Sequence, residues 1–180
     1  VRCRQLALEL NKLGHEVGVY GPPYEVMTKV DKTIFSIWEP EKPWSNSLDD
    51  AASLLEVGHK NAAKAYIIDD YRVDEIYQMA LKRAGSIWLQ FQGLGKQPIW
   101  ADIFLTSHSW MTSDDLYPYI KNKHCKIMSG MKYVILREQF RDLRTPKTAN
   151  SVQRVFVSFG GGNDRGGAKF ILETLKDQLP

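Results

Sequence analysis

Short apolar segments alternate with longer amphipathic ones along most of the chain. The short segments hold three to six residues, in which apolar side chains either alternate with polar ones or follow one another directly. Alternation with a period of two, or a brief β-branched and aromatic run between turn residues, predicts a strand. The strands predicted on this basis cover residues 17–20, 33–38, 66–68, 87–91, 103–106, 126–128 and 154–159.

The longer segments carry apolar residues at helical spacing. Cys3, Leu6, Leu10 and Leu13 recur along the opening segment, and Gly14 follows them as a residue suited to ending a helix. A second helix is predicted to begin at Ser47 as N-cap, with Asp49 and Asp50 in its first turn. Further helices are predicted over residues 73–84, 116–121 and 168–179. Strands that alternate with helices predict the α/β fold class, with a parallel sheet covered on both faces.

The order of the elements also predicts the domain organisation. A sheet of this kind normally begins with a strand, whereas this pattern begins with a helix, so we expect a strand ahead of Val1. Residues 141–153 are polar, contain Pro146 and show no clear period, which predicts a linker. We therefore expect one domain over residues 1–145, a linker at 146–153, and the first strand and helix of a second domain at 154–180.

Composition and charge narrow the class of protein. Of 180 residues, 43% are hydrophobic and 25% charged, as in ordinary globular proteins, and the net charge of +3 comes from positive residues scattered among acids. The basic stripe of a nucleic-acid binder is missing from this sequence. No apolar run could span a bilayer and no signal peptide is evident, which predicts a cytoplasmic protein. Cys3 and Cys125 form no CxxC motif or Cys/His cluster, so neither a disulfide nor a metal site is expected.

Polar side chains directly follow two of the predicted strands. Asp69, Asp70 and Tyr71 come after the third predicted strand, and His108 comes after the fifth. Ligands of open parallel sheets bind beyond the carboxyl ends of the strands, so Asp70, Tyr71 and His108 are candidates for facing a substrate. The alternative is that one aspartate caps the next helix while the other hydrogen-bonds within a turn, and that His108 is a turn or surface residue.

A glycine-rich turn separates the last predicted strand from the last predicted helix. It reads FGGGND, beginning with Gly160, and the backbone N–H groups of Gly161, Gly162 and Asn163 are suited to surrounding phosphate oxygens. The turn matches neither the Walker motif, which needs Gly-Lys-Ser/Thr, nor GxGxxG. The alternative is that glycine stands here because the turn is tight.

Four segments together resemble a known family. They are VRCRQLALELNKLGHEV, YIIDDYRVDEIY, SGMKYVILREQF and VFVSFGGGND, and their order and approximate spacing resemble those of the PseG/SpsG group of sugar-nucleotide enzymes. This group includes the UDP-2,4-diacetamido-2,4,6-trideoxy-altropyranose hydrolase of pseudaminic acid synthesis, and it is similar to the MurG-type glycosyltransferases. The resemblance implies a GT-B architecture, in which a sugar nucleotide lies between two Rossmann-like domains, and this chain covers the N-terminal portion.

The resemblance also implies roles for particular residues. A catalytic histidine is expected upstream of Val1, and Tyr71 matches the tyrosine of the family's D-x-Y motif, where Asp70 is its neighbour. The glycine turn matches the loop that holds the diphosphate, with Asn163 where many members have an aspartate.

A second departure from the family lies near the fourth predicted strand. Gln90, Phe91 and Gln92 stand where many relatives carry a pair of aspartates. Replacing acids by neutral groups changes both the charge and the hydrogen-bonding capacity of the position.

These features favour hydrolysis of a UDP-sugar, at its anomeric carbon or its diphosphate bond, in nucleotide-sugar or surface-polysaccharide biosynthesis. Two alternatives remain open: a glycosyltransferase that uses the same donor, and a non-catalytic sugar-nucleotide binder. A phosphoacceptor receiver would explain the Asp69 and Asp70 pair, but no later strand supplies the lysine that it needs. No cofactor is expected, and residues 1–180 alone are expected to be inactive.

Overall fold

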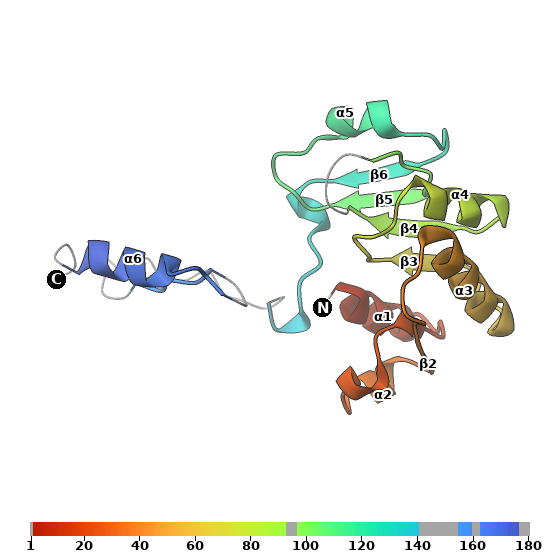
Figure 1. The fold of residues 1–180 in the computed structure, drawn as a ribbon, viewed down its shortest axis with the longest axis horizontal. Coiled ribbons are helices and arrows are strands. Elements are labelled where there is room, and N and C mark those ends of the chain that lie inside the picture. The colour runs from red at the N-terminus through yellow and green to blue at the C-terminus, as the bar shows by residue number, and fades with distance from the viewer. Residues whose placement is uncertain (1, 93–96, 141–154, 160–162, 177–180) are drawn as a thin grey trace. The chain divides into compact units, whose positions relative to one another are not determined.

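The computed structural model describes residues 2–92, 97–140, 155–159 and 163–176 (Figure 1). The chain divides into two compact units, Val1–Asp142 and Leu143–Pro180. All the strands found among the described residues belong to the first unit.

Six short strands of the first unit form two parallel sheets. The two-stranded sheet pairs β1 (Gly18–Gly21) with β2 (Ile37–Pro40), and the four-stranded sheet has the order β3 (Tyr66–Ile68), β4 (Trp88–Phe91), β5 (Ile103–Thr106) and β6 (Lys126–Ser129). Every neighbouring pair is parallel, with Gly18 opposite Ile37 in the first sheet and Ile67 opposite Leu89 in the second. The first unit therefore has a Rossmann-like α/β fold, in agreement with the predicted class.

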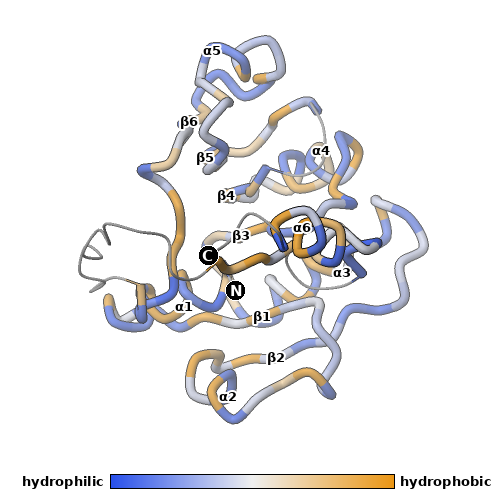
Figure 2. Tube along the Cα trace, turned by 90° about the vertical axis from the view of Figure 1, so that its left-hand side faces the viewer, coloured by the Kyte–Doolittle hydropathy of each residue, from blue (hydrophilic) through white to orange (hydrophobic). Residues whose placement is uncertain are grey.

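Helices flank these sheets. They are α1 (Arg2–Lys12), α2 (Asp31–Ile34), α3 (Ser47–Lys60), α4 (Glu75–Arg83) and α5 (Ser113–Leu116), with single 3₁₀ turns at Tyr24–Val26, Tyr117–Tyr119, Met131–Tyr133 and Glu138–Phe140. Helix α3 packs along α4, and α1 contacts α2 (Figure 1). Hydrophobic and hydrophilic residues alternate along α3 and α4 (Figure 2), as expected for helices with one side on a sheet and the other in solvent.

The hydrophobic core belongs to the four-stranded sheet and to α3 and α4. Its most completely buried members include Ala51 on α3, Leu81 on α4 and Trp88 on β4. Ile68 and Phe104 extend the same cluster along neighbouring strands. Strands β4 and β5 are largely buried, as expected for the central strands of a parallel sheet.

Most predicted elements are confirmed to within one residue at each end. These are the helix that ends before Gly14 and the strands at residues 17–20, 66–68, 87–91, 103–106 and 126–128. The helix predicted from Ser47 is also present, but its N-cap is Asn46, whose side-chain oxygen accepts the Asp49 N–H at 2.9 Å. The Ser47 hydroxyl instead donates to Asp74 at 2.6 Å, and Asp74 in turn caps α4.

The strand predicted at residues 33–38 is wrong in its first half. Helix α2 ends at Ile34, and β2 begins three residues later. The cause is Asp31, whose buried carboxylate accepts hydrogen bonds from the Thr28 N–H at 2.9 Å and hydroxyl at 2.7 Å and from Arg4 at 2.8 Å. These bonds close a helical turn that the local apolar pattern does not reveal.

The helix predicted at residues 116–121 is displaced towards the N-terminus. Helix α5 covers Ser113–Leu116, where Thr112 and Asp115 form a capping box, and a 3₁₀ turn follows. Pro118 lies within that turn and has no backbone N–H with which to continue a helical ladder.

The second unit contains one described helix, α6 (Gly167–Leu175). It begins where Asp164 accepts hydrogen bonds from the N–H groups of Gly166 at 3.0 Å and Ala168 at 2.9 Å. The strand predicted at 154–159 is not confirmed, since residues 155–159 form no strand. A strand needs a neighbour with which to pair, and Phe156 is exposed here. The predicted linker at 146–153 lies outside the described residues.

None of the helices described is both long enough and apolar enough to cross a membrane.

Candidate functional site

Polar side chains follow β2, β3, β4 and β5 at their carboxyl ends. Because the strands within each sheet are parallel, their carboxyl ends lie along one edge of that sheet, the edge at which open α/β sheets bind ligands. We call seven residues here the carboxyl-end rim: Glu41 after β2, Asp69, Asp70, Tyr71 and Arg72 after β3, Gln92 after β4, and His108 after β5. The rim includes both sheets, since Arg72 donates to Glu41 at 2.8 Å.

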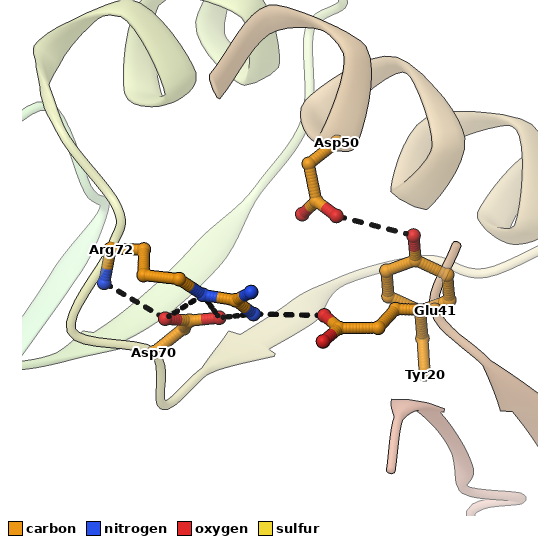
Figure 3. A network of polar contacts seen from close by, with 5 residues as sticks. All are labelled: Tyr20, Glu41, Asp50, Asp70 and Arg72. Atoms are coloured by element: carbon orange, nitrogen blue, oxygen red, sulfur yellow. Dashed lines mark hydrogen bonds and ion pairs between the residues drawn. The ribbon is translucent and has the colours of Figure 1, made fainter. Parts of the chain in front are cut away.

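Asp70 is held in an ion pair with Arg72 (Figure 3). Its carboxylate accepts hydrogen bonds from the Arg72 backbone N–H at 2.8 Å and from Nε at 3.0 Å. Burial raises the pKa of Asp70, but the hydrogen bonds and positive charge of Arg72 outweigh burial and leave the pKa below its ordinary value. Asp70 is therefore an ionised hydrogen-bond acceptor at neutral pH and is poorly suited to donating a proton.

Aromatic rings support the other side of Arg72. Its guanidinium carbon lies 4.3 Å from the centre of the Trp44 ring, and Trp44 stacks on Tyr77 with ring centres 6.3 Å apart. Such a cation–π contact fixes the guanidinium plane, so Arg72 presents Asp70 in a defined orientation.

A buried carboxylate, Asp50 of α3, lies close to this ion pair (Figure 3). The Tyr20 hydroxyl donates to it at 3.4 Å. Burial raises the pKa of Asp50, and a hydrogen bond from the Tyr77 hydroxyl only partly opposes that shift. Burial and the nearby charge of Asp50 also raise the pKa of Tyr20, to about 12. Asp50 thus holds a proton at higher pH than Asp70 does.

Asp69 faces α1. Arg2 forms an ion pair with its carboxylate, and Cys3 Sγ donates to Oδ2 at 3.7 Å. The Arg2 guanidinium also lies 4.4 Å from the centre of the Phe91 ring. Burial, together with the charge of Asp69, raises the pKa of Cys3 to about 11, so this thiol stays protonated and is a poor nucleophile. Asp69 therefore fixes the first turn of α1 against the ends of β3 and β4.

His108 is positioned by the two neighbouring strands. Its Nδ1 lies 3.1 Å from Gln92 Oε1 and 3.3 Å from Thr106 Oγ1, and its ring stacks on Trp110 with centres 4.6 Å apart. Since an amide oxygen can only accept, Nδ1 is the donor in the contact with Gln92, and in the neutral ring Nε2 is then the acceptor. Trp110 is 73% exposed, so a flat apolar surface adjoins this hydrogen-bonding group.

Tyr71 and Gln90 occupy contrasting environments. Tyr71 is 58% exposed, and its side chain interacts electrostatically with Arg2. Gln90 is buried in β4, where its Oε1 accepts from Trp88 Nε1 at 3.2 Å. Of Gln90 and Gln92, only Gln92 therefore reaches the rim.

The structure brings some predicted site residues together and leaves others apart. Asp70 and Tyr71 share the end of β3, whereas His108 pairs with Gln92 and shares no hydrogen bond with Asp70 among the described side chains. Gly160, Gly161 and Gly162 lie outside the described residues. Asn163 accepts the N–H of Arg165 at 2.9 Å, a local turn contact ahead of α6.

Sequence reasoning missed Arg72, Trp110 and the link between Tyr20 and Asp50. Arg72 and Trp110 each stand close to a predicted site residue in the segments DDYR and SHSW, so proximity was an available signal. The Tyr20 and Asp50 contact joins positions 30 apart and follows from the packing of α3 near β1.

In the described part of the chain, no group of three or more His, Cys, Asp or Glu side chains is arranged to hold a metal ion. A scan against protein-family models finds no match for this chain, and no curated protein matches it either.

Proposed function

We propose that this chain belongs to an enzyme that binds a UDP-sugar and hydrolyses it. The single observation that carries the proposal is that Asp70, Tyr71, Gln92 and His108 follow the carboxyl ends of three neighbouring strands in a Rossmann-like sheet. Ligands of such sheets bind at that edge, and sugars need several directional hydrogen-bonding partners. The resemblance in four sequence segments supports the choice of a nucleotide sugar.

Three rim residues and the neighbouring Trp110 have proposed tasks. His108 accepts a hydrogen bond from a sugar hydroxyl through Nε2, while Trp110 covers an apolar face of the sugar ring. Ionised Asp70 accepts from a second hydroxyl, and the exposed Tyr71 hydroxyl donates to substrate oxygens.

The hydrolysis itself needs a base and a stabilised leaving group. In the proposed reaction water attacks the anomeric carbon or a phosphorus atom of the diphosphate and passes its proton to a general base. UDP leaves with the bonding electron pair in the first case, and UMP or the sugar phosphate leaves with it in the second. A role in holding phosphates for the glycine turn that begins at Gly160 stays a prediction from the sequence.

Turnover of the complete protein with UDP-N-acetylglucosamine and related UDP-sugars tests the proposal. Release of UDP or UMP without any added acceptor is expected. Tyr71→Phe and His108→Gln should each lower kcat/KM about tenfold, because each variant loses one hydrogen bond to the substrate. Tyr117→Phe is the matched control, because Tyr117 is equally exposed but follows α5. Absence of both binding and release, or equal losses in all three variants, would contradict the proposal.

A further inference from the structure

Basic residues gather at the edge of the four-stranded sheet where its strands begin. In the sequence they are spread between positions 60 and 126, with acidic residues among them. The fold brings them together, because α3 and α4 both end on the side of the sheet at which the arrows start (Figure 1). The residues that precede β3, β4 and β6 therefore lie along one edge.

We call this edge the amino-edge surface. Of the residues described there, two are acidic, Glu56 and Asp102, and seven are basic: Lys60, Lys64, Lys82, Arg83, Lys121, Lys123 and Lys126. The Asp102 carboxylate accepts from Lys82 Nζ at 3.3 Å and from Asn122 Nδ2 at 3.1 Å. Its backbone oxygen accepts the Lys126 N–H at 2.8 Å. The end of α4, the start of β5 and the segment that enters β6 are thus held side by side.

Helix ends account for only part of this positive charge. Cations in the last turn of a helix interact favourably with its dipole, which explains Lys60 on α3 and both Lys82 and Arg83 on α4. The other four basic residues lie in the segments that enter β3 and β6, beyond the ends of these helices. All four are exposed, and within the described structure no ion pair joins them to an acid. Their charge is therefore left to act on a partner.

We infer that the amino-edge surface binds the anionic headgroups of a membrane surface. Six of its seven basic residues are lysines, whose ammonium groups are compact, hydrated charges on flexible stems. Clusters of this size are attracted to phosphatidylserine headgroups without a fixed contact geometry. Ile87, which leads into β4, is 58% exposed at the same edge, so one apolar side chain is available to enter the headgroup region.

The composition of the amino-edge surface favours a lipid surface over other polyanions. Protein–protein interfaces are enriched in aromatic residues and arginine and depleted in lysine, whereas this surface holds a single arginine. Single-stranded nucleic acids stack their bases on exposed aromatic side chains. Tyr66 and Trp88, which begin β3 and β4, are half-buried and buried respectively. Neither alternative therefore matches this edge as well as a bilayer surface does.

The amino-edge surface and the carboxyl-end rim lie at opposite ends of the same strands. Lys64 precedes β3, for example, and Asp70 follows it. Membrane binding at one edge therefore does not use the residues of the other. The inference goes beyond the proposed function and does not depend on it.

Co-sedimentation with lipid vesicles tests this inference. The chain is mixed with vesicles of phosphatidylcholine that contain about 30% phosphatidylserine, and with vesicles of phosphatidylcholine alone. Binding to the anionic vesicles is expected, with little binding to the neutral ones. Raising the NaCl concentration from about 0.1 M to about 0.5 M should release the protein, because salt screens exposed charges.

Charge reversal identifies the residues that bind the vesicles. Lys64→Glu combined with Lys123→Glu should lower the partition onto anionic vesicles about tenfold or more, since two attractive charges become repulsive. The milder pair Lys64→Gln and Lys123→Gln should give a smaller loss. The matched control combines Lys29→Glu with Lys32→Glu, which changes the net charge equally at exposed positions in and just before α2. This control should bind almost as well as the unchanged chain.

Three results would overturn the inference. The first is that the unchanged chain does not bind anionic vesicles at low salt. The second is an equal loss of binding in the two charge-reversed pairs, because net charge and not the amino-edge surface would then be responsible. The third is binding to polyglutamate or to duplex DNA without binding to the vesicles.

Discussion

Asp31 and Asp70 are each held by an arginine, in different settings, and the pKa of each differs from that of an isolated carboxylate. Asp31 is almost fully buried and binds Thr28 and Arg4, whereas Asp70 lies at the carboxyl-end rim with Arg72. In each case burial raises the pKa, and the partners outweigh it and bring the pKa below its ordinary value. Asp31 consequently contributes to stability, while Asp70 is kept ionised at the rim.

The contribution of ionised Asp31 to the free energy of unfolding should depend on pH. A lowered pKa means that its contribution is present above the ordinary aspartate value of about 3.9 and is lost as the pH falls through the folded-state pKa. Asp31→Asn should lower the free energy of unfolding at pH 7 by on the order of 2 kcal/mol and flatten its decline below pH 4. Urea unfolding at several pH values measures this. Asp114→Asn, at an exposed position, is the control, and equal curves for the two variants would count against the assignment.

At the scale of elements, the spacing of apolar residues along the sequence predicts most strands of the sheets. Strands such as β3 and β5 are short apolar runs bounded by turn residues, and their sequence alone predicts them. Helix α2 escaped prediction because its turn depends on hydrogen bonds from Thr28 and Arg4 to Asp31, which the pattern of apolar residues does not show. Residues 155–159 have a strand-like pattern, yet a strand forms only where a partner strand is present.

The candidate site was predictable in part, because local sequence patterns show where strands end but not which side chains meet across the fold. Position after a strand identified Asp70, Tyr71 and His108, because strand ends can be read from a local pattern. The partners of these residues could not be identified, since Gln92 reaches His108 across the sheet and Glu41 reaches Arg72 from another sheet.

Close packing of α3 on β3 gives a prediction at this scale. A methyl group added at Gly58 would overlap the Tyr66 ring and hydroxyl. Gly58→Ala should therefore destabilise the protein by about 1–3 kcal/mol, although alanine normally favours a helix over glycine. Thermal unfolding measures the change, with Glu56→Ala at an exposed position of the same helix as the control. A melting temperature that rises in Gly58→Ala would show that α3 is not packed as described.

At the scale of the whole molecule, the first unit holds its own core. The buried cluster runs from Ala51 to Leu116, and the residues packed against it extend to Ile127. A chain that ends at Asp142 keeps all of these residues. It should unfold cooperatively, with a near-ultraviolet circular dichroism signal from buried Trp88. Loss of that signal on truncation would mean that the core needs residues beyond Asp142.

Nuclear magnetic resonance of residues 1–180 titrated with UDP-N-acetylglucosamine tests whether the carboxyl-end rim binds the proposed ligand. The predicted result is a saturable shift of the Gln92 side-chain amide, the His108 ring and the Trp110 indole N–H. The Trp100 indole N–H donates at 3.1 Å to Glu75, which is not a rim residue, and its signal should stay unchanged. No shift at millimolar ligand, or shifts at Trp100 without any at His108, would show that the rim does not bind this ligand.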